Sequence, residues 1–260
     1  MSNPVINNFG KMGNGGYPAP TPGELQGMYD QPAYAGPRQG GGYMTLDSVV
    51  QRTAAMLATV FLVGAVTWVA VPDNLFLPAL LIGAFGGLAL GLFLSFTGRV
   101  NPATALLYAA FEGVFLGAIS HAFERIWPGI VIQAVIGTAM VAGGMLFVYK
   151  IGAIRVTPRL TRIVVGATIG VLGLMLVNLI AYLFVDGGLG LRDGGPLAII
   201  FSLVCIVIAS FNLVLDFDMI ERGIRQGAPQ KMAWLAAFGL TVTLVWLYLE
   251  ILRLISYTRD

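Results

Sequence analysis

Long apolar segments separated by short polar connections make up most of this chain. Seven segments contain about 18 or more mostly apolar residues, the length at which an α-helix can cross the hydrocarbon core of a bilayer. This pattern predicts an all-α membrane protein, a bundle of seven transmembrane helices surrounded by the lipid bilayer. The segments lie near residues 53–71, 76–96, 104–122, 129–149, 162–185, 196–215 and 234–256.

The stretch before the first segment has the opposite character. Residues 1–45 are rich in Gly, Pro, Asn, Gln and Tyr, with few aliphatic residues and no helical period. Such a composition buries too little apolar surface to offset the loss of chain entropy on folding. We therefore predict a disordered tail over residues 1–45, followed by the seven-helix domain over 46–260. The Pro and Tyr content also permits a short motif that binds membrane-protein partners, but a solubilising tail is favoured.

Composition excludes several classes of function. The chain is 57% hydrophobic and only 11% charged, whereas soluble domains carry roughly 25% charged residues. A net charge of +2, with no basic patch containing interleaved aromatic residues, argues against nucleic-acid binding. Cys205 and His121 are the single cysteine and histidine, which argues against a conventional cysteine or histidine metal site, and no cofactor is predicted. We interpret Cys205 as a packing residue and His121 as a residue of the membrane surface.

The distribution of lysine and arginine predicts the orientation. Basic residues concentrate on the cytoplasmic side of membrane proteins, and here most of them lie on the side of the N-terminal tail. We therefore predict a multi-pass protein of the cell membrane with a cytoplasmic N-terminus. As an alternative, the last segment could re-enter the membrane, which would return the C-terminus to the cytoplasm. The opposite side holds Arg125, Arg192, Arg253 and Arg259.

Two carboxyl groups stand where lipid-facing helices do not tolerate charge. Asp216 follows the apolar run 196–215, and Glu250 lies inside segment 234–256. An ionised side chain at the centre of a hydrocarbon layer costs at least about 2.5–3.5 kcal/mol, so such residues normally face the interior of a bundle. We therefore predict that Asp216 and Glu250 form the functional site. For Glu250 the alternative is a pair with Arg253 in the same helix, both groups reaching for the membrane surface.

The chemistry expected of this pair is proton and cation binding. Glu250 lies roughly 10 Å below the end of its helix, where it either takes up a proton or is held ionised by a cation. Next to Asp216, one of the two would hold a proton near neutral pH, because like charges at close range resist joint ionisation. Such a pair senses pH and gates ions, and its oxygens suit a hard cation such as Ca²⁺. Asp218 is instead predicted to pair with Arg222 at the solvated helix end.

Four further polar residues are candidates for a polar pathway through the bundle. Glu112 has apolar or small neighbours in its segment, so we predict that it faces inward, in the pathway or paired with a basic residue near the helix entrance. Amides inside membrane helices commonly hydrogen-bond to a neighbouring helix, with direct contact to an ion as the alternative. The four candidates are Glu112, Arg99, Asn178 and Asn212.

Three runs resemble one family. The run NLVLDFDMIERG resembles the acidic signature at the end of the sixth helix in the Bax inhibitor family of seven-helix membrane proteins. In that signature an aspartate is followed four positions later by an isoleucine. Here Asp216 takes the place of the aspartate and Ile220 that of the isoleucine. WLYLEILRLIS is similar to the last helix of the family, with Glu250 in place of its acid, and YAAFEGVFLGAIS resembles the third helix. The resemblance covers about residues 50–258, and the tail looks like that of actinobacterial members of a bacterial branch.

This resemblance implies a bundle whose last helix is central and wrapped by the other six. It also implies a pH-sensitive Ca²⁺ leak in which the acidic pair opens or closes a cytoplasmic gate. Two departures stand out. The acid of the last helix is usually aspartate, and Glu250 is one methylene longer. The second helix of bacterial relatives can carry an acid and a following arginine, but here it has no acid, and Glu112 with Arg99 are candidates to substitute.

Two other classes of function stay open. An intramembrane protease would need two carboxylates sharing one water. The expected glycine-flanked motif is absent and Asp216 lies near a helix end, so no enzymatic activity is predicted. The alternative to the leak is a regulatory membrane protein that binds other membrane proteins or a protease, without transport of its own, to which the tail over residues 1–45 is suited.

Overall fold

A computed structural model describes residues 42–185 and 187–259, and the regular structure within these ranges is helical. All seven long helices have the length and hydropathy to cross a membrane, which confirms the predicted all-α membrane protein. The predicted disordered tail covers residues 1–45. Residues 1–41 lie outside the described residues, whereas Met44 is buried and Thr45 caps α3. The helices are α3 (Leu46–Ala70), α4 (Phe76–Thr97), α5 (Pro102–Ile126), α6 (Ile130–Lys150), α7 (Pro158–Ala181), α8 (Pro196–Arg225) and α9 (Met232–Tyr257), with a short 3-10 turn, η1 (Asp73–Leu75), before α4.

Capping side chains set the starts of α3, α5 and α7. Thr45 caps α3 by accepting a hydrogen bond from the Ser48 backbone, so α3 begins before the apolar segment predicted from residue 53. Asn101 caps α5 in the same way. At the other extreme α8 continues past the apolar run that ends at 215 and reaches Arg225, because its last turns carry stabilising charge pairs spaced four residues apart.

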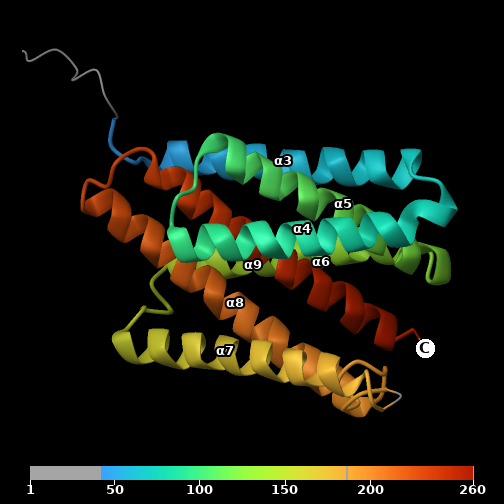
Figure 1. Cartoon of the computed structure of the whole chain (residues 1–260). Helices are drawn as coiled ribbons and strands as arrows, with labels where there is room; N and C mark the ends of the chain where they lie inside the picture. Colours follow the sequence, from blue (N-terminus) through green and yellow to red (C-terminus); the bar gives the residue numbers. More distant parts are fainter. Residues whose placement is uncertain (1–41, 186, 260) are drawn as a thin grey trace, which may run out of the picture. The chain divides into compact units, whose positions relative to one another are not determined.

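The helices run alternately up and down, which places their ends in two groups (Figure 1). We call the end at which α3 begins and α8 gives way to α9 the N-side end. There Arg52 donates to the Gln230 carbonyl at 2.9 Å, and Met44 is buried. The end at which α9 stops is the C-side end, where Arg259 donates to the Pro128 carbonyl at 3.0 Å.

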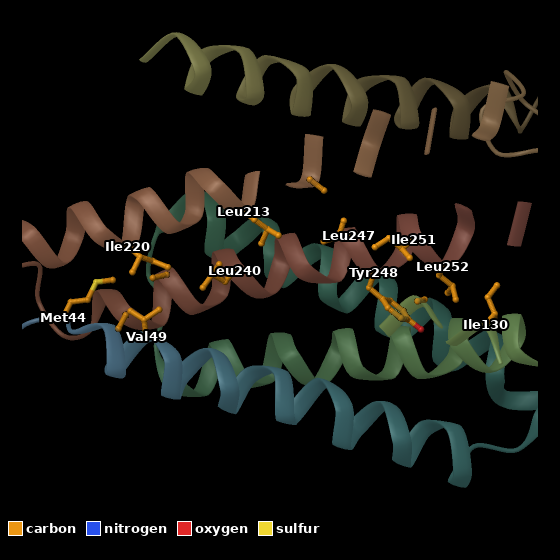
Figure 2. Close-up of a cluster of buried hydrophobic side chains, with 14 residues drawn as sticks. Met44, Val49, Ile130, Leu213, Ile220, Leu240, Leu247, Tyr248, Ile251 and Leu252 are labelled. Atoms are coloured by element: carbon orange, nitrogen blue, oxygen red, sulfur yellow. The ribbon is translucent and has the colours of Figure 1, made fainter. Parts of the chain in front are cut away.

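The last helix lies at the centre of the bundle. α9 packs against α3, α5, α6 and α8, and it carries the largest buried fraction of the seven helices. Figure 2 shows Leu240, Leu247 and Ile251 along α9, with Leu213 and Ile220 of α8 beside them. The expected central position is therefore confirmed. The expected wrapping by all six other helices is replaced by an outer layer, since α4 packs on α5 and α7 on α8.

Glycine permits the closest helix contacts. A Cβ added to Gly117 of α5 would lie 2.5 Å from the Gly64 carbonyl oxygen of α3, and one added to Gly83 of α4 would lie 2.5 Å from the Phe115 backbone nitrogen of α5. The backbones of α3, α4 and α5 thus approach to a distance that excludes a methyl group. The glycines of α7 differ, because a Cβ on Gly170 would meet open space.

We predict that Gly117→Ala destabilises the protein by about 1–3 kcal/mol, the usual range for overpacking a close contact. The physical reason is that α5 must move away from α3 to admit the methyl group. The matched control is Gly170→Ala, for which the thermal unfolding temperature in detergent should be unchanged or slightly higher. Equal unfolding temperatures for Gly117→Ala and the wild type would contradict the assigned close packing.

Candidate functional site

Asp216 lies between α8 and α9, in the half of the bundle nearer the N-side end. The Thr243 hydroxyl of α9 donates a hydrogen bond of 2.7 Å to Asp216 Oδ2. The other carboxylate oxygen lies beside Gly239, where a Cβ would be 3.7 Å away. At 1.5 Å per residue, Asp216 is about 14 Å from the end of α8. Gly239 and Thr243, one turn apart on α9, thus form the wall that receives this carboxyl group.

Glu250 is fully buried in α9 and forms a two-pronged ion pair. Its Oε1 and Oε2 accept hydrogen bonds of 2.7 and 2.9 Å from the two terminal nitrogens of Arg192. The Trp246 ring nitrogen donates to Oε1 at 3.4 Å, and Arg253 lies 3.6 Å from the same oxygen. Parallel hydrogen bonds between guanidinium and carboxylate are among the strongest that side chains make. Both oxygens of Glu250 are therefore committed to basic and N–H donors.

The connection between α7 and α8 delivers Arg192 to this position. The Asn178 side chain at the end of α7 accepts a hydrogen bond of 2.9 Å from the Leu189 backbone, which holds the connection against the bundle. The Arg192 guanidinium then lies over the Phe201 ring, 5.1 Å from its centroid, and donates to Ser202 Oγ at 3.4 Å. Aromatic, hydroxyl and carboxylate groups thus surround an arginine that enters the bundle from the C-side end.

The ion pair keeps Arg192 charged. Burial alone lowers the pKa of its guanidinium, but the hydrogen bonds to Glu250 and the negative charge of that carboxylate raise the pKa by more. The side chain of Arg192 is 19% exposed and that of Glu250 is not exposed at all, so water does little to screen the pair. The result is a hydrogen-bonded ion pair that joins the α7–α8 connection to α9.

Asp216 and Glu250 are far enough apart to act separately. Thr243, which binds Asp216, precedes Glu250 by two helical turns on α9, a rise of about 10 Å. Among the described residues, no hydrogen bond joins the two carboxyl groups. The structure therefore places the two carboxyl groups with separate partners rather than as a proton-sharing pair or a joint Ca²⁺ site, and Arg192 bonds to both oxygens of Glu250. The alternative pairing with Arg253 is present only as a secondary contact of 3.6 Å.

The four candidates for a polar pathway are not brought together. Glu112 lies between α4 and α5, where Gly87 leaves room for it: a Cβ there would be 3.0 Å from Glu112 Oε1. Arg99 is exposed at the connection between α4 and α5, and no ion pair joins it to Glu112 in the described ranges. The Asn212 amide donates to Thr168 of α7 at 2.8 Å, which confirms the expected bond to a neighbouring helix.

Two residues of the site escaped sequence reasoning. Arg192 is one of the few basic residues near the C-side end, and a fully buried Glu250 needs a cation as partner. The small number of basic residues at that end was therefore the signal that could have identified Arg192. Thr243 left no signal, because a threonine inside an apolar helix usually bonds to the carbonyl one turn back, as Thr243 also does with Gly239 at 3.2 Å. The predicted Asp218–Arg222 pair is confirmed at 2.6 Å.

The comparisons with known proteins agree with the resemblance seen in the three runs. The family described as Bax inhibitor 1 like matches residues 3–260. A comparison with curated proteins finds none that matches this chain. The family prediction is confirmed, and the assignment to a bacterial branch stays a prediction.

We predict that Arg192→Met destabilises the protein by about 3–5 kcal/mol, because it leaves a buried carboxylate without its cation. The double variant Arg192→Met with Glu250→Met removes both charges and should unfold at a temperature closer to that of the wild type. Thermal unfolding of the two single variants and the double variant in detergent gives the coupling between the side chains. Additive effects of the two substitutions would contradict the ion pair.

Proposed function

Because this chain belongs to the Bax inhibitor 1-like family of membrane proteins, we propose that it is a pH-sensitive cation leak that passes Ca²⁺ down its gradient. The Asp216 carboxyl carries this proposal. It lies inside the bundle with a single hydroxyl donor, Thr243, and no ion pair joins it to a basic side chain in the part of the chain that the structure describes.

The surroundings of Asp216 suit a transient cation. A carboxylate has about four acceptor positions, and Thr243 uses one of them. Carboxylate and hydroxyl oxygens are ligands that Ca²⁺ prefers, and one carboxylate binds it weakly enough for the ion to leave again. When Asp216 takes up a proton, its charge is lost and the attraction for a cation with it. Protonation of this one side chain would therefore reduce the leak.

Glu250 has a different part in the proposal. Near the C-side end of α9, Glu250 is paired with Arg192, and Arg253 lies beside the same carboxylate. A cation entering from that end meets a guanidinium before it meets a free carboxylate. We propose that this pair is a permanent seal and that pH control resides at Asp216, nearer the N-side end.

The excess of basic residues near the N-side end supports a cytoplasmic N-terminus and a place in the cell membrane. Asp216 then faces the cytoplasmic half of the bundle. The separate partners of Asp216 and Glu250 favour ion handling over proteolysis, since a protease of this kind needs two carboxyl groups around one water. A regulatory protein that binds partners through residues 1–45 is the competing proposal.

The experiment measures Ca²⁺ flux in proteoliposomes from mildly acid to mildly alkaline pH. Wild-type flux should fall as the pH falls, because protonation removes the negative charge at Asp216. Asp216→Asn has the shape of the protonated side chain, so its flux should stay at the acid level of the wild type at every pH. Asp218→Asn is the matched control two residues away, and it should keep the pH dependence of the wild type.

Either of two results contradicts the proposal. An unaltered pH profile in Asp216→Asn would remove this carboxyl as the sensor. No Ca²⁺ flux above that of protein-free vesicles, combined with membrane-protein partners that are captured only when residues 1–45 are present, would favour the regulatory function instead.

A further inference from the structure

A cleft separate from both carboxyl groups lies in the half of the bundle nearer the C-side end. Its volume is about 570 Å³, within the usual range for sites that bind small molecules. α3 and α6 form its two walls, and α5 and α9, on which both walls pack, form its floor. Phe61 and Val69 stand at its rim, 59% and 85% exposed, so the cleft opens sideways toward the surrounding lipid.

The length of the cleft matches one leaflet of a bilayer. Along α3 its lining runs from Leu57 to Val69, a rise of about 18 Å at 1.5 Å per residue. Half of a typical hydrocarbon core is about 15 Å thick. On α6 the lining runs from Val131 to Ala142, which is again the half of the helix nearer the C-side end. A chain that lies in this cleft therefore spans a single leaflet.

The walls are almost entirely hydrocarbon. The Ser120 and Tyr248 hydroxyls, at the floor, bond to each other at 2.6 Å (Tyr248 is labelled in Figure 2). The Thr138 hydroxyl donates to the Ala134 carbonyl of its own helix at 2.7 Å. An ion or a polar ligand would lose its hydration and find few partners to replace it. A saturated or unsaturated hydrocarbon chain loses nothing and fills the space.

We infer that this cleft binds one acyl chain of a membrane phospholipid drawn from the leaflet at the C-side end. Small side chains make the space available, since Ala65 of α3 and Ala139 of α6 line opposite walls. The chain would be held on three sides, by both walls and the floor, whereas lipid on the outer faces of α4 or α7 touches one helix surface. This enclosure distinguishes a bound lipid from the general lipid shell.

The experiment uses the full chain in vesicles of phosphatidylcholine that contain a small fraction carrying a photoreactive diazirine in its acyl chain. After illumination, label should concentrate on the parts of α3 and α6 that border the cleft. In mild detergent, native mass spectrometry should show one phospholipid retained per chain. Ala139→Trp fills the cleft and should lower both signals about tenfold, because losing the burial of only two methylene groups changes affinity by that factor.

The matched control is Ala89→Trp, which adds the same bulk to the exposed surface of α4 and should leave label and retained lipid unchanged. Ala65→Trp tests the opposite wall and replaces Ala139→Trp if that variant does not fold. Label spread evenly over α4, α7 and the cleft, or full lipid retention in both filled variants, would overturn the inference. Crosslinks between two copies through α3 and α6 would overturn it as well, since a second copy would then occupy the cleft.

Discussion

The arrangement of the C-side end depends on one ion pair. Glu250 lies on the most buried helix of the bundle with no exposure to solvent, and an unpaired charge there would not be tolerated. Arg192 satisfies it from a connection whose course is set by Asn178 and by several glycines with positive φ, among them Gly188 and Gly190. α7, whose main packing partner among the described helices is α8, is thus linked through this connection to the centre of the bundle.

The seven helices could be predicted because the length of an apolar run is a local property of the sequence. The Asp218–Arg222 pair could be predicted because its two members are four residues apart on one helix. The partners of Asp216 and Glu250 could not be predicted in this way. Arg192 reaches Glu250 from a glycine-rich connection whose path depends on the tertiary fold. Asp216 reaches Thr243 across a helix interface, and a threonine in an apolar run has many possible roles. Sequence periodicity identifies buried residues, but it does not pair them.

The position of Thr243 also changes the meaning of the family resemblance. The resemblance set Glu250 in the place of the last-helix acid that accompanies the sixth-helix aspartate. The structure instead places Thr243 opposite Asp216, two turns before Glu250. An acid facing a hydroxyl differs physically from an acid facing an acid, because no like charge opposes ionisation and the hydroxyl can donate to the carboxylate. Under the proposed function, a single side chain rather than a coupled pair would take up or release the proton.

The two carboxyl groups therefore differ in what can alter them. Removing the charge of Glu250 would leave the Arg192 guanidinium beside it without a counter-ion, so a change of protonation there works against the fold. Protonation of Asp216 exchanges one hydrogen-bonded state for another, since a carboxylic acid still accepts the Thr243 hydrogen bond through its carbonyl oxygen. A sensor must change state without unfolding its surroundings. By that criterion the proposed pH response fits Asp216, whereas loss of the charge at Glu250 would break the pair with Arg192 that stabilises the bundle.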